Sequence, residues 1–160
     1  MARSRAGRVV ALLLLVGGAR VDGGPARAAV APPITTHPIG ERYVGPLVAG
    51  PGGSWFASQG TDLSTDWIGR ITSAGQITHF RLPAAEFVGT VNDLAAGPGG
   101  NVWYTRGNGV ADAAVGYVTP AGVIRQLDLP VVEGFQESPR GITAGPDGAM
   151  WSTRSSGSAA

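Results

Sequence analysis

The chain has 160 residues, of which 43% are hydrophobic and 14% are charged, which fits one compact domain and excludes the highly charged composition of a disordered protein. Its 26 glycines and 12 prolines follow no collagen-like triplet and are typical of turns between many short strands, so we expect an all-β fold. The formal net charge of +1 and the absence of cysteine exclude a strongly basic protein, disulfides and thiolate metal sites.

The first residues have the pattern of a secretory signal peptide. Arg3, Arg5 and Arg8 precede the apolar run Val9–Val16, and this order of basic and apolar residues is typical of an export leader. Eight residues are too few to span a bilayer as a helix. We therefore assign residues 1–31 to a signal peptide and expect a secreted or periplasmic protein, with a retained anchor or an arbitrary apolar start as the alternatives.

Small residues after the apolar run offer several cleavage points. The candidates are Ala26-Arg27-Ala28 and Ala29-Val30-Ala31, with cleavage after Ala19 as an alternative. Without the leader, the chain keeps seven basic and ten acidic residues, a net charge of −3. Because no clustered basic face remains, nucleic acid is not an expected partner.

An internal repeat fills the rest of the chain. A phrase with Ala-Gly-Pro and a tryptophan occurs at Leu47–Phe56, Leu94–Tyr104 and Ile142–Trp151. A second phrase, at Ile68–Ile77 and Val115–Ile124, recurs after 47 residues. Each phrase predicts a hairpin, because Pro and Gly favour tight turns and the apolar residues between the turns alternate.

Two hairpins per repeat make four antiparallel strands, which is typical of a β-propeller blade. We predict an incomplete β-propeller of about two and a half blades over residues 32–154, followed by a disordered tail at 155–160. The expected blade segments are 34–39, 47–83, 94–130 and 142–154. Such a chain is a truncated reading frame or a fragment, or else a short protein that completes its ring by oligomerising.

The aromatic residues divide into repeated and unrepeated positions. Trp55, Trp103 and Trp151 recur in the three repeats, and we expect them to fill the interfaces between blades. Trp67 has Ala114 as its counterpart, so the sequence places Trp67 in a variable loop.

Gly141–Trp151, Ile68–Thr72 and Ile77–Pro83 resemble the blade motif of the virginiamycin B lyase (streptogramin lyase) family. The similarity covers Ile34 to Trp151. It implies a seven-bladed propeller whose active member opens a cyclic depsipeptide antibiotic by elimination at its ester bond, with a histidine base and glutamate-bound magnesium.

The resemblance also implies where these catalytic residues lie. A histidine directly precedes the Gly-Ile that opens a catalytic blade, one glutamate lies two residues before it, and another follows the Trp-Phe pair. The corresponding positions hold Arg140, Ser138 and Arg154 in the third repeat, Asn92, Thr90 and Arg106 in the second, and Gly45, Tyr43 and a residue near Ser58 in the first. None offers a base or a magnesium ligand, so we assign no catalytic, cofactor-binding or metal-binding residue.

The remaining candidate sites are few. Two histidines are present: we expect His37 to pack in a strand and His79 to be solvated. The sequence places Asp62, Asp66 and Asp112 in irregular loops, with calcium binding by these loops as an alternative.

One glycine-rich segment and one pair of arginines are the remaining candidates for binding an anion. The segment 97–100 lacks the Lys-Ser/Thr of a phosphate loop and predicts a turn. Arg106 and Arg154 occupy equivalent positions after a tryptophan. They are either solvated loop charges or a paired site for the carboxylate or phosphate of an acidic ligand.

Three function classes follow. The first is an exported, non-catalytic or truncated repeat protein that acts as a binding module for an unknown small molecule or for partner blades. For this class we expect no cofactor, and no membrane span after the leader is removed. The second is a magnesium-dependent carbon–oxygen lyase that is complete only with missing blades or by oligomerisation. The third is another propeller enzyme, such as a lactonase or quinoprotein, which acidic residues around calcium on the channel axis would favour. An open propeller edge also predicts self-association.

Overall fold

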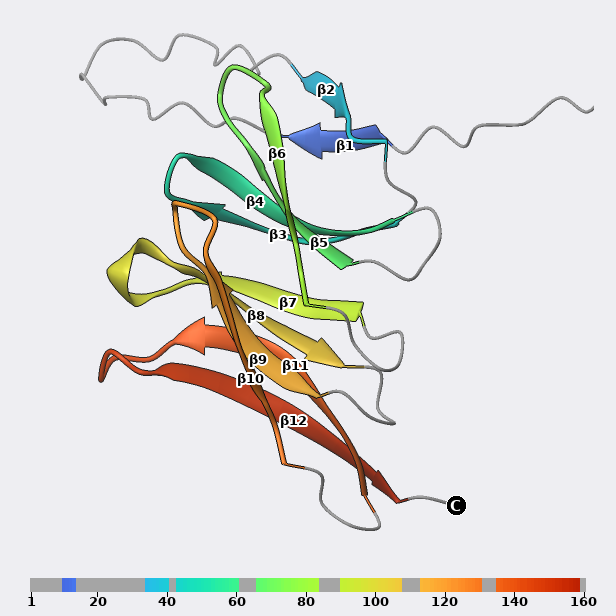
Figure 1. Ribbon diagram of the computed structural model, residues 1–160, viewed down its shortest axis with the longest axis vertical. Helices are drawn as coiled ribbons and strands as arrows, with labels where there is room; N and C mark the ends of the chain where they lie inside the picture. Colours follow the sequence, from blue (N-terminus) through green and yellow to red (C-terminus); the bar gives the residue numbers. More distant parts are fainter. Residues whose placement is uncertain are drawn as a thin grey trace, which may run out of the picture. The chain divides into compact units, whose positions relative to one another are not determined.

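The computed structural model describes residues 10–13, 34–40, 43–60, 66–83, 90–107, 113–130 and 135–158. The chain divides into two compact units, Met1–Gly40 and Glu41–Ala160. The described residues of both units form antiparallel strands, with one short 3-10 turn (Figure 1).

The described residues of the smaller unit form one pair of strands. β1 (Val10–Leu13) pairs with β2 (Thr35–Pro38), with Val10 opposite Pro38. β2 lies inside the strand expected at residues 34–39, and its partner β1 comes from the apolar run assigned to the signal peptide. The candidate cleavage points lie outside the described residues, so the leader remains a prediction.

In the larger unit, the described residues form two four-stranded sheets and one two-stranded sheet, each with its strands in chain order. The first blade consists of β3 (Tyr43–Gly50), β4 (Gly53–Gln59), β5 (Asp66–Ile71) and β6 (Ile77–Arg81). The second blade consists of β7 (Thr90–Ala96), β8 (Val102–Gly107), β9 (Ala114–Val118) and β10 (Ile124–Asp128), with a short 3-10 turn at Pro98–Gly100. The third sheet consists of β11 (Phe135–Ala144) and β12 (Met150–Ser158). Two complete repeats and the half repeat expected from the sequence are therefore present.

The end of the chain differs from the prediction. Residues 155–158, expected to be disordered, belong to β12, where Ser158 lies opposite Phe135. The reason is that β11 begins well before Ile142, the first residue of the recognisable repeat, and so supplies a pairing partner for the tail.

The tight turns lie where the Pro and Gly residues of the repeat predict them. Gly122 and Gly148 have φ angles of 86° and 79°, in the left-handed region that glycine adopts without a steric penalty. Their amides donate to the carbonyl oxygens of Thr119 and Gly145 at 2.9 and 3.1 Å. The predicted Pro-Gly turns are therefore closed hairpins.

The first strand of every repeat contains an irregularity at the same point. The pairing register shifts between Val44 and Leu47 in β3, between Val91 and Asp93 in β7, and between Pro139 and Ile142 in β11. A bulge of this kind lets residues before the repeated phrase continue the strand while turning their side chains in a new direction. This explains why each first strand begins several residues earlier than the predicted segment.

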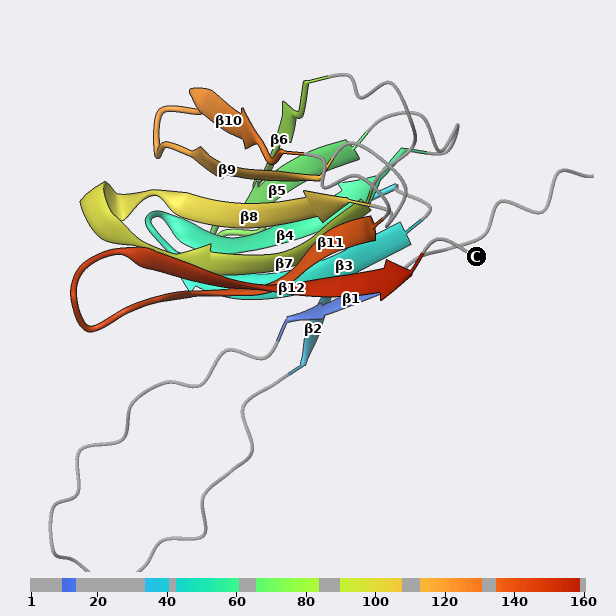
Figure 2. The same cartoon turned by 90° about the horizontal axis from the view of Figure 1, so that it is seen from below.

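The successive sheets pack through their inner strands. β7 of the second blade contacts β3 and β4 of the first blade and β11 of the third sheet. These strands lie one above another in Figure 1 and overlap in Figure 2, which is seen from below. The buried residues at the first contact form one cluster, made up of Trp55, Ala57, Ile68, Leu82, Val91, Leu94, Val102, Tyr104 and Val118. This cluster is the core of the larger unit.

The three repeated tryptophans have different environments. Trp55 is fully buried and stacks on Phe80, with ring centroids 5.5 Å apart, as expected for an interface residue. Trp103 is half-buried and lies 4.8 Å from the Tyr117 ring. Trp151 is 60% exposed, so the expected packing between blades holds for the first tryptophan and fails for the third among the described residues.

The prediction for Trp67 is wrong. Trp67 lies in β5 opposite Arg81, because the pairing of β4 with β5 extends to the residue before it, Asp66. Its ring meets the edge of His79 at 6.0 Å. The variable part of the connection is therefore shorter than expected and precedes Asp66.

Candidate functional site

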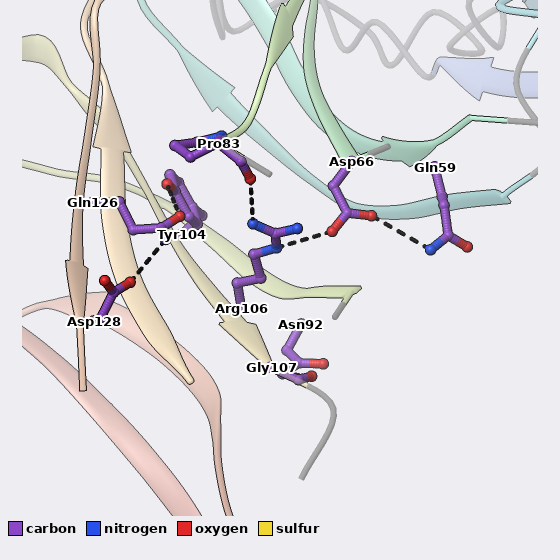
Figure 3. A network of polar contacts seen from close by, with 9 residues as sticks. All are labelled: Gln59, Asp66, Pro83, Asn92, Tyr104, Arg106, Gly107, Gln126 and Asp128. Atoms are coloured by element: carbon purple, nitrogen blue, oxygen red, sulfur yellow. Dashed lines mark hydrogen bonds and ion pairs between the residues drawn. The ribbon is translucent and has the colours of Figure 1, made fainter. Parts of the chain in front are cut away.

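A buried ion pair joins the first two blades. Arg106 Nε, from β8, donates to Asp66 Oδ2, from β5, at 3.0 Å, and both side chains are 4% exposed. Arg106 Nη1 also donates to the carbonyl oxygen of Pro83 at 2.8 Å, and Gln59 Nε2 donates to Asp66 Oδ1 at 3.4 Å (Figure 3). One arginine of the second blade thus contacts two segments of the first, at Asp66 and Pro83, and Gln59 supports the Asp66 carboxylate from a third.

Burial dominates the electrostatics of this pair. Loss of solvent raises the pKa of Asp66 above its ordinary value, while the guanidinium of Arg106 and the amide of Gln59 partly oppose the change. The carboxylate is held in place by two side-chain donors, which is the arrangement that makes a buried charge tolerable.

These contacts correct two expectations from the sequence. Asp66 is a buried strand residue rather than a loop carboxylate, and Arg106 is a buried ion-pair partner rather than a solvated loop charge. The sequence could not show this, because the two residues are 40 positions apart and the Asp66 carboxylate does not recur in the second repeat, where Ala113 is its counterpart. Asp62 and Asp112 lie outside the described residues.

Arg154 repeats part of the arrangement at the next interface. Its Nη2 donates to the carbonyl oxygen of Pro130 at 3.4 Å, and Pro130 is the counterpart of Pro83. The counterpart of Asp66 is Ala113, which has no carboxylate to offer, and Arg154 is exposed. Because Arg106 is buried with its own carboxylate, it does not form a paired anion site with Arg154. Anion binding by the exposed Arg154 stays a prediction.

Side chains of the second blade hold the bulge of the third sheet. Asn92 Nδ2 donates to the carbonyl oxygen of Pro139 at 2.7 Å. The Asp93 Oδ2 atom accepts a hydrogen bond from the Ile142 amide at 2.9 Å, and Thr105 Oγ1 donates to the Arg140 carbonyl oxygen at 2.6 Å. The backbone on both sides of the bulge is therefore fixed from the neighbouring blade.

These holding residues were not recognised in the sequence. Their counterparts in the first repeat are Gly45, Pro46 and Ala57, none of which has a polar side chain. The signal in the sequence was the difference itself: three positions are polar in the second repeat and apolar in the first. Residues that the repeats share do not reveal such positions.

The positions that the family resemblance assigns to catalysis carry other roles here. Arg140, at the bulge of β11, is exposed and its Nε donates to Ser155 Oγ at 3.2 Å. Ser138 is 1% exposed, and its hydroxyl accepts a hydrogen bond from Asn92 at 3.4 Å. Thr90 is half-buried at the start of β7. A guanidinium, two hydroxyls and an amide supply neither a neutral-pH base nor carboxylate ligands for magnesium.

Both histidines lie in strands, His37 in β2 and His79 in β6. His79 is half-buried between the rings of Phe56 and Trp67, each with its centroid 6.0 Å away, so the prediction of a solvated side chain is wrong. His37 is half-buried in β2, as expected of a strand residue. Within the described ranges, no three His, Cys, Asp or Glu side chains gather as metal ligands.

Tyr104 lies beside the ion pair in the core. Its hydroxyl donates to Gln126 Oε1 at 3.1 Å, and Gln126 Nε2 donates to Asp128 Oδ1 at 2.9 Å. Burial raises the pKa of Tyr104 to about 12. The phenol therefore stays neutral and structural at physiological pH.

No helix in the described part of the chain is long and apolar enough to cross a membrane.

Comparison with known proteins identifies similar molecules. The model of the virginiamycin B lyase family matches residues 21–160. Two crystal structures from Staphylococcus aureus are similar: selenomethionine-substituted virginiamycin B lyase, at 26% identity and a TM-score of 0.57, and a catalytically inactive histidine-to-alanine virginiamycin B lyase with quinupristin, at 25% identity and a TM-score of 0.58. Each alignment covers 74% of this chain and 38% of the solved protein. No curated protein matches the chain.

Proposed function

The chain belongs to the virginiamycin B lyase family and forms part of its β-propeller, and from this membership we propose that it is an exported, non-catalytic propeller segment that acts by binding. Since it spans 38% of the solved lyases, the activity of a whole lyase is a separate proposal.

The main support is the chemistry at the bulges. Where the family resemblance expects a histidine base, the second and third repeats carry Asn92 and Arg140. Replacing a histidine by alanine accompanies catalytic inactivity in the Staphylococcus aureus protein. Asn92 is engaged with the backbone of the third sheet, and an arginine stays protonated at every physiological pH. Neither residue can take a proton from a substrate.

The implied magnesium does not fit these residues either. Magnesium binds carboxylate and water oxygens, whereas the corresponding positions supply Ser138, Thr90, Arg106 and Arg154. Arg106 already neutralises a carboxylate of the first blade. We therefore derive no reaction step through a metal in this chain.

Incubation of the purified chain with quinupristin and magnesium tests the proposal. We expect no linearised product by mass spectrometry, while virginiamycin B lyase from Staphylococcus aureus in a parallel reaction gives complete conversion. Product that accumulates in proportion to the concentration of this chain, and disappears when the chain is heat-denatured, would refute the non-catalytic assignment.

A second candidate is a magnesium-dependent carbon–oxygen lyase whose catalytic blades come from further sequence or from another copy. Its support is the partial coverage of the solved lyases. Sequencing the DNA downstream of the Ala160 codon separates the candidates: in-frame blades with the His and Glu positions filled favour the lyase, and unrelated sequence favours the binding module.

Export is tested separately, by fusing residues 1–40 to a reporter enzyme that is active only outside the cytoplasm. We expect activity from this fusion and none when Arg3, Arg5 and Arg8 are replaced by Glu, because the leader needs its basic start. Equal activity of both fusions contradicts export through this segment.

A further inference from the structure

A small pocket lies between the first and second blades. It is lined by Ala57, Ser58, Gln59, Asp66, Thr90 and Val91, from β4, β5 and β7, and its cavity volume is about 10 Å³. A cavity of roughly 10–15 Å³ holds one water molecule. The space therefore suits a single small group, such as one hydroxyl of a ligand whose remaining atoms stay outside.

The hydroxyl of Ser58 is the unusual feature of this pocket. Ser58 is 4% exposed, and its Oγ atom is buried without a hydrogen-bond partner. A buried polar atom without a protein partner is costly and rare in folded proteins, and a bound water, an ion or a polar group of a ligand can supply the partner. Ser58 occupies the position of Arg106 and Arg154 in the other repeats, so a short side chain stands where the neighbours have a long one.

The charges around the pocket select an uncharged ligand. The Asp66 carboxylate is balanced by Arg106 at 3.0 Å, so an additional ion would leave one charge without a partner. Gln59 bonds the same carboxylate at 3.4 Å, and Thr90 adds a second hydroxyl to the lining. A group that both donates and accepts hydrogen bonds matches this mixture, and a hydroxyl is the smallest such group.

We propose that this pocket is a subsite for the hydroxyl group of a small uncharged compound, which pairs with Ser58 Oγ beside the Asp66–Arg106 ion pair. The subsite gives the proposed binding role a location, and the two proposals fail separately. Turnover of quinupristin would refute the non-catalytic assignment without affecting the subsite. Failure of the subsite to bind a hydroxyl compound would refute the subsite without affecting the non-catalytic assignment.

Titration of the isotope-labelled chain with ethylene glycol tests the subsite, with nuclear magnetic resonance of the backbone amides as the measurement. We expect saturable shifts of the Ser58, Gln59 and Val91 amides. Acetonitrile, which is of similar size but has no hydroxyl, is expected to leave these amides unchanged. Linear shifts up to the highest concentration, or equal effects of both probes, would overturn the proposal.

Two variants and a control connect the signal to Ser58. Ser58→Ala is expected to weaken ethylene glycol binding about tenfold, which corresponds to the loss of one hydrogen bond. Ser58→Cys fills the same space with a weaker hydrogen-bonding group and is expected to weaken binding similarly. Ser152→Ala, on an exposed strand position away from the pocket, leaves the affinity unchanged. A folded Ser58→Ala or Ser58→Cys variant with the original affinity contradicts the assignment.

Discussion

Arg106 and Asp66 form an ion pair of 3.0 Å across the boundary between two blades, and both side chains are almost completely removed from solvent. Since each belongs to a different blade, the pair contributes to blade packing rather than to the stability of one sheet. Buried ion pairs of this kind are sensitive to the loss of a single partner, because the remaining charge is left without compensation.

The first prediction concerns this pair. Arg106→Ala leaves the Asp66 carboxylate buried alone and is expected to lower the free energy of unfolding by about 3–5 kcal/mol, measured by urea denaturation. The matched control is Arg154→Ala, an exposed arginine at the equivalent position, with an expected change within about 0.5 kcal/mol. The double variant Asp66→Ala/Arg106→Ala is expected to be more stable than Arg106→Ala. Equal effects of the two arginine substitutions would contradict the role of the pair.

The second prediction concerns Asn92. Its side chain bridges to the Pro139 carbonyl oxygen at 2.7 Å, so Asn92→Ala leaves a partly buried acceptor without a donor and is expected to cost about 1–3 kcal/mol. The loss is expected to be local, with faster hydrogen exchange at Ile142 than at Ile68. Gln76→Ala, at an exposed turn position, serves as the control. Uniform acceleration across both blades would indicate global destabilisation instead.

The third prediction concerns the glycine of the Ala-Gly-Pro phrase. A Cβ atom at Gly97 would collide with the Trp103 ring and lie 2.7 Å from Met150 Sδ. Gly97→Ala is therefore expected to cost about 1–3 kcal/mol through overpacking. Gly145→Ala meets the Trp151 ring in the same way, but this ring is exposed and can turn aside, so its cost is expected to be smaller. Equal losses of unfolding free energy in the two variants would refute this explanation.

The fourth prediction is a pH dependence set by Tyr104. Burial raises the pKa of its hydroxyl to about 12 from an ordinary value of 10.0, so the folded state holds the proton more tightly than the unfolded state. The resulting stability is present below pH ~10 and is lost as the pH rises to about 12. The loss is expected to reach about 2–3 kcal/mol. The measurement is urea denaturation between these pH values, and Tyr104→Phe is expected to show a flatter profile. Parallel profiles would contradict the shift.

The fifth prediction concerns self-association. Trp103 of the second blade lies close to Gly97, where Met150 of the third sheet also packs. The equivalent Trp151 of the third sheet is 60% exposed. Exposed aromatic surface of this kind favours association, so the sedimentation coefficient is expected to rise with protein concentration. Trp151→Glu is expected to abolish this rise. Leu127→Glu, which changes a residue 70% exposed on β10, is expected to leave it. A wild-type chain that stays monomeric at all concentrations would show that the Trp151 face does not associate.

The repeat and its hairpins could be predicted because their causes are local. Gly122 and Gly148 close turns whose geometry depends on neighbouring residues, and alternating apolar residues define strand faces without knowledge of the fold. The bulges could not be predicted, because a register shift depends on the partner strand. For the same reason the starts of β3, β7 and β11 were placed too late.

The sequence by itself determined the family and the four-stranded repeat, because these depend on residue identity at repeated positions. The lack of a base at Asn92 and Arg140 stays a prediction from the family resemblance. Only the tertiary structure decided that Asp66 is buried with Arg106, that Asn92 holds the next sheet, and that Ser58 faces a pocket. Each contact joins residues from different blades, and the same pair of residues does not recur along the chain. They depend on blade packing, which brings distant polar side chains together where solvent is excluded.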